Sequence, residues 1–230
     1  MYPYDIIFTL NNTQKFIVEL DDFLEKLPCF CQTPIIFFNN KQKLYLSHDS
    51  LPDDIINLRT LLTKALNNEL PLHKSITDIG YSENMRCAYE EQQILAEEKN
   101  STYQWEPNPN VVYIQEDSYP SWVGEAYRLW GYQNIIAWIY NDSSKNIIFT
   151  ITPRYPDFFT EDSNSIKESY GKWIQSYQPI ITQVISPQVA QQWINQADKI
   201  INFIENKWTA ADNEIDKDAP MTYEDCPRNM

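Results

Sequence analysis

Residues 134–156, NIIAWIYNDSSKNIIFTITPRYP, decide the fold. An apolar run at 135–140 is followed by turn-forming residues at 141–145 and by a second apolar run at 147–152, which Pro153 closes. Short β-branched and aromatic runs on either side of an Asn/Asp/Ser turn are typical of an antiparallel β-hairpin. Alternate residues of the second run share a face, so one face is expected in the core and the other partly in water.

Weaker strand signals precede this hairpin. Residues 6–10 and 16–20 are separated by an Asn-Asn turn and predict a first hairpin, and residues 35–38 and 43–46 flank a polar turn and predict a second. The continuously apolar run at 35–38 is expected to be buried on both faces. Because hairpins pair antiparallel strands, we expect an antiparallel or mixed sheet.

Helices are predicted between and after these strands. Apolar residues recur at helical spacing over 51–67. Residues 85–99 have Ala88, Ile94 and Leu95 as their main apolar positions and are otherwise rich in Glu and Gln, which predicts a solvated surface helix. The C-terminal third is expected to be helical at 166–177, with 180–185 as a bent continuation, and again at 187–208, where the apolar stripe is most regular.

The strands and helices occur in clusters rather than in strict alternation. The predicted fold class is therefore α+β, a small antiparallel or mixed sheet with packed helices and a helical C-terminal third. We expect a single α+β domain over residues 1–208, with a candidate internal boundary in the Pro- and Asn-rich stretch 100–110. Residues 209–230 contain six acidic and two basic residues and are expected to form an acidic, flexible tail.

The composition excludes several classes of function. The 230 residues include only four glycines, which lie far apart, so a dinucleotide fingerprint or a Walker loop cannot form and no cofactor is expected. A formal charge of −14 disfavours nucleic-acid binding, and no apolar run is long enough to span a membrane. Without a secretory signal, and with four sparse cysteines, the chain is expected to be cytoplasmic with reduced thiols.

No group of residues forms a recognisable catalytic or metal site, so none is predicted. His48 stands beside Asp49 without a nucleophile motif, and His73 has no partner that the sequence identifies. Cys29 and Cys31 form a CxC pair, for which burial as small apolar side chains is weighed against convergence with distant ligands on zinc. The paired carboxylates are typical of solvated charge, with glycoside hydrolysis as the alternative.

One stretch combines uncompensated acid with aromatic residues. Between Tyr103 and Tyr127 there are four acidic residues and no Lys or Arg. Aromatic side chains anchor protein interfaces and charge steers association, so this composition favours a basic protein partner, and the preceding Glu-rich residues extend the acidic surface. The alternative is that Trp122 and Tyr127 begin a core helix while the acids face water. The predicted partner-binding residues are Trp105, Glu106, Glu116, Asp117, Tyr119, Trp122, Glu125, Glu90, Glu91, Glu97 and Glu98.

Residues 134–156 also resemble a pattern found in immunity proteins of bacterial polymorphic and contact-dependent toxin systems, a hairpin followed by ITPxYP. The resemblance rests on Trp138, Phe149, Pro153 and Tyr155. It implies a small cytoplasmic protein that neutralises one cognate toxin, with no catalysis and no cofactor, and it transfers no binding residue. Strong acidity fits inhibition of a basic nuclease, because carboxylates can occupy its phosphate-binding site.

The sequence thus predicts a non-catalytic inhibitor of a basic, nuclease-type toxin. Two alternatives stay open. A carboxylate-dependent hydrolase of a polysaccharide requires two carboxyl groups about 5 to 10 Å apart across a cleft. An acidic nucleic-acid mimic that inhibits a nucleic-acid enzyme requires carboxylates at phosphate-like spacing over one long face.

Overall fold

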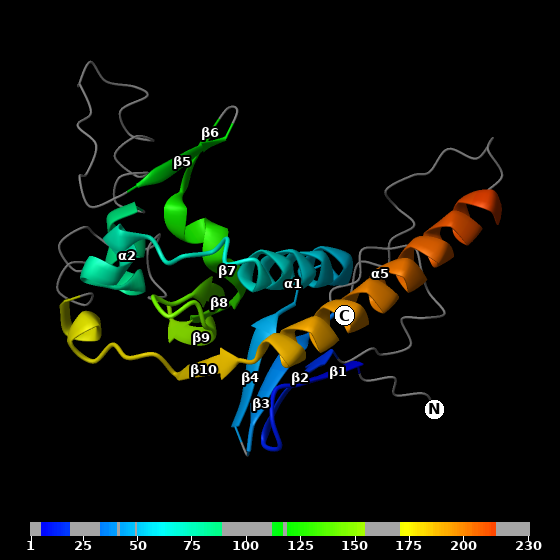
Figure 1. Ribbon diagram of the computed structural model, residues 1–230, viewed down its shortest axis with the longest axis horizontal. Coiled ribbons are helices and arrows are strands. Elements are labelled where there is room, and N and C mark those ends of the chain that lie inside the picture. Colours follow the sequence, from blue (N-terminus) through cyan, green and yellow to red (C-terminus); the bar gives the residue numbers. More distant parts are fainter. Residues whose placement is uncertain are drawn as a thin grey trace. The chain divides into compact units, whose positions relative to one another are not determined.

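The computed structural model describes residues 6–18, 33–40, 42–48, 50–88, 112–116, 119–154 and 171–214 (Figure 1). Two four-stranded antiparallel sheets, a two-stranded hairpin and several helices confirm the predicted α+β class. The chain divides into two compact units, the first made of Met1–Thr60 with Gln188–Met230 and the second of Leu61–Pro187. The sequence predicted one domain with a candidate boundary at 100–110, and those boundary residues lie outside the described ranges.

The sheet of the first unit contains four strands in chain order, drawn in shades of blue in Figure 1. They are β1 (Ile6–Thr9), β2 (Gln14–Val18), β3 (Ile35–Asn39) and β4 (Gln42–Ser47). Both N-terminal hairpins predicted from the sequence are confirmed. Phe8, Phe16 and Phe37 stand opposite one another in the register and are fully buried, so aromatic packing across the strands forms the centre of this core.

Helix α1 (Leu51–Leu66) follows β4, close to the predicted range 51–67. Its N-terminal turn contains Asp53 and Asp54, which suit the positive end of the helix dipole. Asp54 also accepts a hydrogen bond from Ser47 at 2.6 Å, which joins the helix start to the end of β4. Ile55, Leu58 and Leu62 recur at helical spacing and are fully buried.

The long helix α5 (Pro187–Glu214) covers the edge of the first sheet. Trp193 packs edge-on against Phe8 and Phe16, and its indole N–H donates to the carbonyl of Thr9 at 3.0 Å. Gln196 donates to the carbonyl of Ile7 at 3.0 Å. The helix runs six residues beyond the predicted end at 208, so residues 209–214 of the expected tail are helical, and residues 215–230 lie outside the described ranges.

The sheet of the second unit has the order β10-β9-β8-β7. Strands β8 (Ile135–Asn141) and β9 (Ile147–Pro153) confirm the hairpin predicted at 135–152. The expectation that one face of the second run lies partly in water is wrong, because residues 147–152 of β9 are buried on both faces. Asp142 closes its turn, because the carboxylate accepts hydrogen bonds from the Ser144 and Asn146 main-chain N–H groups and the Asn146 side chain. These hydrogen bonds lower the pKa of Asp142, and the one from the Asn146 side chain has the largest effect.

Two strands of this sheet were not predicted. Strand β7 (Arg128–Tyr132) pairs with β8, and β10 (Ile181–Ile185) pairs with β9. The prediction that 180–185 continues a helix is therefore wrong. Pro179 interrupts the preceding helix, described at 171–175, and the alternating burial of Ile181 and Ile185 suits a strand.

A buried asparagine connects this hairpin to α1 and the residues after it. Asn141 is 2% exposed, and its side-chain amide donates to the carbonyl of Ala65 at 2.9 Å. Its side-chain oxygen accepts from the N–H of Leu70 at 3.2 Å, and an isolated parallel bridge joins Asn141 to Pro71. Both polar ends of the side chain are satisfied, as burial requires.

The remaining elements of the second unit lie between α1 and β7. They are α2 (Lys74–Ile79), a helical segment at 81–88, β5 (Tyr113–Glu116), β6 (Tyr119–Trp122) and the 3₁₀ helix η2 (Val123–Tyr127). The predicted solvated helix at 85–99 is corrected at its described end, because the helix begins at Tyr81 and Met85, Cys87 and Ala88 are buried.

Candidate functional site

The candidate site is the acidic segment, residues 89–111, whose described flanks are the helix 81–88 and the β5–β6 hairpin with η2. The segment contains five acidic residues and one lysine. Its predicted partner-binding residues lie outside the described ranges: Glu90, Glu91, Glu97, Glu98, Trp105 and Glu106. The structure therefore shows how the two flanks are held.

A buried hydrogen bond ties the two flanks together. The indole N–H of Trp122 donates to the side-chain oxygen of Asn84 at 2.5 Å. The Asn84 amide donates to the carbonyl of Ser75 at 3.2 Å, and Asn84 is fully buried. The N–H of Val123 donates to the carbonyl of Val112 at 2.8 Å, which fixes the returning chain to η2. The acidic segment thus leaves and rejoins the second unit at points that are held by direct contacts.

Trp122 is part of the core in this structure. It is 3% exposed, so the prediction that it anchors a partner at the surface is corrected, and the alternative assignment to the core applies. Its ring also lies so close to Gly124 that a Cβ atom there would stand 2.3 Å from the indole. Glycine is required at this position because the backbone passes directly over the ring.

The other predicted residues are placed less completely. Glu116 lies in β5 and Tyr119 in β6, where the structure describes the backbone only, and Asp117 is outside the described ranges. Glu125 is exposed and pairs with Arg128 at 3.3 Å. The first base after the acid-rich stretch therefore compensates one of its acids.

Trp122 belongs to a cluster of aromatic side chains that includes Tyr81, the first residue of the helix 81–88. Tyr81 stacks on Trp138 with ring centroids 4.6 Å apart, and Trp138 meets Trp122 edge-on at 6.1 Å. Tyr81 also lies 5.8 Å from Tyr140. The Tyr81 hydroxyl is buried without a hydrogen-bond partner. Burial, followed by the neighbouring tyrosine hydroxyls, raises the pKa of Tyr81 well above its ordinary value of 10.0.

Tyr127, at the end of η2, differs from Tyr81 in having a partner. Its hydroxyl donates to the carbonyl of Pro71 at 2.7 Å, which fixes η2 to the loop before α2. Burial raises the pKa of Tyr127, and the main-chain hydrogen bond from His73 opposes the rise. His73 itself caps α2, because its Nδ1 accepts from the Ser75 N–H at 3.1 Å. This capping role was not evident from the sequence.

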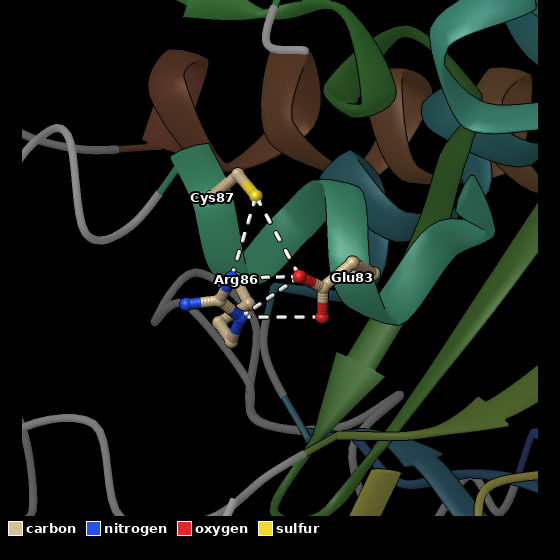
Figure 2. Close-up of polar contacts among 3 residues, drawn as sticks. All are labelled: Glu83, Arg86 and Cys87. Atoms are coloured by element: carbon tan, nitrogen blue, oxygen red, sulfur yellow. Dashed lines mark hydrogen bonds and ion pairs between the residues drawn. The ribbon is translucent and has the colours of Figure 1, made fainter. Parts of the chain in front are cut away.

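The helix 81–88 also contains a small polar cluster, formed by half-buried Glu83 and Arg86 and buried Cys87 (Figure 2). Both Nε and a terminal nitrogen of Arg86 contact the Glu83 carboxylate, the shorter distance being 2.6 Å. The Cys87 sulfur lies 3.7 Å from a terminal nitrogen of Arg86 and 3.9 Å from a carboxylate oxygen of Glu83. The cluster is therefore an ion pair at i,i+3 spacing on the helix, beside a buried thiol.

The part of the chain that the structure describes contains no group of three or more His, Cys, Asp or Glu residues able to hold a metal ion. Cys29, Cys31 and Cys226 lie outside it. Among the described helices, none combines the length and apolar character needed to cross a membrane.

The charge is distributed unevenly over the chain. The described ranges contain twelve acidic and twelve basic residues. The other ranges contain 20 acidic and six basic residues, which accounts for the whole formal charge of −14. Taken together, the described residues are therefore formally neutral, and the net negative charge is carried by residues outside the described ranges.

Comparison of the chain with protein-family models, with curated proteins and with solved structures gave no match.

Proposed function

We propose that this chain is a non-catalytic protein inhibitor, an immunity protein, that binds and neutralises a basic toxin, most directly a nuclease. The observation that carries the proposal is the distribution of charge, with neutral described ranges and a charge of −14 on the remaining segments. Concentrated charge of one sign accelerates association with a partner of the opposite sign. The inhibitor would act in the cytoplasm, where the toxin would otherwise reach its substrate.

The acidic segment carries part of this charge, and the structure shows contacts that hold the residues on either side of it. The Asn84–Trp122 hydrogen bond and the buried aromatic cluster hold the chain on both sides of residues 89–111. The described flanks are thus held in place, and a binding surface that is already ordered loses less entropy on association. This arrangement favours a binding role for the segment.

The described carboxylates give less support to the hydrolase alternative. Glu83, Glu125 and Asp198 each pair with an arginine. A glycosidase needs two carboxyl groups that face each other across a cleft, whereas each of these three carboxylates faces an arginine.

Co-expression with the product of the neighbouring gene tests the proposal. The neighbouring product alone should stop bacterial growth, and co-expression of this chain should restore growth. A variant with Glu90, Glu91, Glu97 and Glu98 replaced by Gln should lose protection and fail to retain the neighbouring product in a pull-down. Its matched control replaces four acids of another segment with their amides: Asp157, Glu161, Asp162 and Glu168.

The control variant should keep protection, because it removes the same charge elsewhere. A neighbouring product without toxicity would contradict the proposed function. Equal behaviour of the two variants would contradict the role of the acidic segment while leaving the inhibitor proposal to stand on the wild-type rescue.

A further inference from the structure

The two four-stranded sheets have the edge strands β1, β4, β7 and β10. Within the described ranges, β10 is the edge strand that lacks protection against pairing with another strand. Edge strands expose unpaired N–H and C=O groups, and proteins usually block them with charges, prolines, bulges or covering side chains. On β1, Trp193 and Gln196 donate to edge carbonyls. β4 contains Lys43 and a register shift against β3, and β7 contains Arg128 and a register shift against β8.

Within the described part of the chain, none of these devices is present on β10. Its five residues, ITQVI, pair with β9 in an uninterrupted register, and they include neither a charge nor a proline. Within the described ranges β9 is its sole neighbour in the sheet. Val184 is 59% exposed, more than any other large hydrophobic side chain that the structure describes. An exposed, regular and uncharged edge is suited to pairing with another strand.

The chemistry of the strand identifies its occupant. We propose that β10 pairs antiparallel with β10 of a second copy of this chain, so that the two sheets continue into one another across a twofold axis. With Gln183 on the axis, Ile181 would face Ile185 of the second copy, and Thr182 would face Val184, which has the same shape. The strand is thus complementary to itself, as a twofold interface requires.

The surrounding sequence permits this approach in a strongly acidic chain. No charged residue occurs between Lys172 and Asp198, which is the longest uncharged run in the sequence. Two copies of a chain of charge −14 repel each other, and directly opposed like charges destabilise strand pairing. A contact centred on β10 keeps formal charges out of the pairing strands.

The interface is small, so the dimer is expected to be reversible. Stable interfaces bury about 1,200 to 2,000 Å², and one five-residue strand from each copy covers less than that. Sedimentation equilibrium of the full chain should show a mass that rises from 27.2 kDa toward twice that value between about 1 and 300 μM. A single 27.2 kDa species over this range would overturn the proposal.

Two charge variants test the location. Val184→Lys should weaken dimerisation at least about tenfold, because lysine on an edge strand opposes pairing. Ile56→Lys is the matched control, since Ile56 is a 45% exposed apolar residue on α1 and receives the same charge. Circular dichroism confirms that both variants fold. A dimer that is insensitive to Val184→Lys would overturn the proposal.

A cysteine variant keeps the test valid if Val184→Lys does not fold. Gln183→Cys places two thiols opposite each other on the axis, within the range from which a disulfide can form. Mild oxidation should yield a covalent dimer well above that of Ser144→Cys, an exposed control with the same native cysteines. Equal cross-linking of the two variants, or protection of β10 from hydrogen exchange that appears only when the toxin partner is added, would overturn pairing with a second copy.

Discussion

Replacement of Tyr81 by Phe should stabilise the protein. The Tyr81 hydroxyl is buried without a partner, and an unsatisfied buried polar group costs about 1–3 kcal/mol. Phenylalanine keeps the ring that stacks on Trp138 at 4.6 Å and removes the unsatisfied hydroxyl. We expect the free energy of unfolding to rise by about 1 kcal/mol at pH 7, the lower end of that range, because the hydroxyl also leaves a small void.

The same variant should change the response to alkali. The pKa of Tyr81 in the folded state lies above the ordinary value of 10.0 that applies after unfolding. The unfolded chain therefore releases this proton first, so the free energy of unfolding does not depend on this group below about pH 10 and falls as the pH rises above it. Tyr81→Phe should flatten the fall in stability above pH 10, and the raised pKa values of Tyr140 and Tyr177 should maintain part of it.

Urea denaturation at pH 7 and at pH 10.5 measures both effects. Tyr127→Phe is the matched control, because its hydroxyl donates to the carbonyl of Pro71 at 2.7 Å. The free energy of unfolding of that variant should be lower by about 1–3 kcal/mol at pH 7, because the Pro71 carbonyl loses its hydrogen-bond partner. If Tyr81→Phe destabilises the protein as much as Tyr127→Phe does, the assignment of an unsatisfied hydroxyl is refuted.

Three further substitutions test the packing. Gly124→Ala should cost about 2–4 kcal/mol in thermal denaturation, because the new Cβ would stand 2.3 Å from the Trp122 ring. Gly171→Ala, where nothing lies within 4 Å, should be neutral or stabilising by up to about 1 kcal/mol. Asn141→Ala should lower the free energy of unfolding by about 2–4 kcal/mol in urea denaturation, because it leaves the Leu70 N–H and the Ala65 carbonyl without a partner. Arg59→Ala should change stability by less than about 1 kcal/mol, since the side chains of its ion pair are 50% and 40% exposed.

Local sequence signals predict the elements whose pairing is local. The hairpin at 135–152 and helix α1 follow from periodicity and turn residues alone, and the structure reproduces both. Strand β10 was missed because its partner β9 is nearly 30 residues earlier in the chain, and five residues of mixed polarity do not distinguish a strand from a short helix. Tertiary pairing decided the conformation there.

The candidate site was predictable in composition but not in detail. The acid-rich stretch is visible in the sequence, whereas the partner of Trp122 is not. Asn84 lies just before the run that the sequence assigns to a solvated helix, and it contacts a residue 38 positions away. Trp and Tyr serve interfaces and cores equally well, so composition alone cannot assign Trp122 to one of them.

The division of the chain into units has a consequence for its synthesis on the ribosome. The second unit is continuous, from Leu61 to Pro187, whereas the first combines the N-terminal 60 residues with Gln188–Met230. The carbonyls of Thr9 and Ile7 accept hydrogen bonds from residues 184 and 189 positions later, respectively. Domains usually complete themselves from the N-terminus during translation. Here β1 stays without these donors until Trp193 and Gln196 have been synthesised, so the second unit can finish folding before the first.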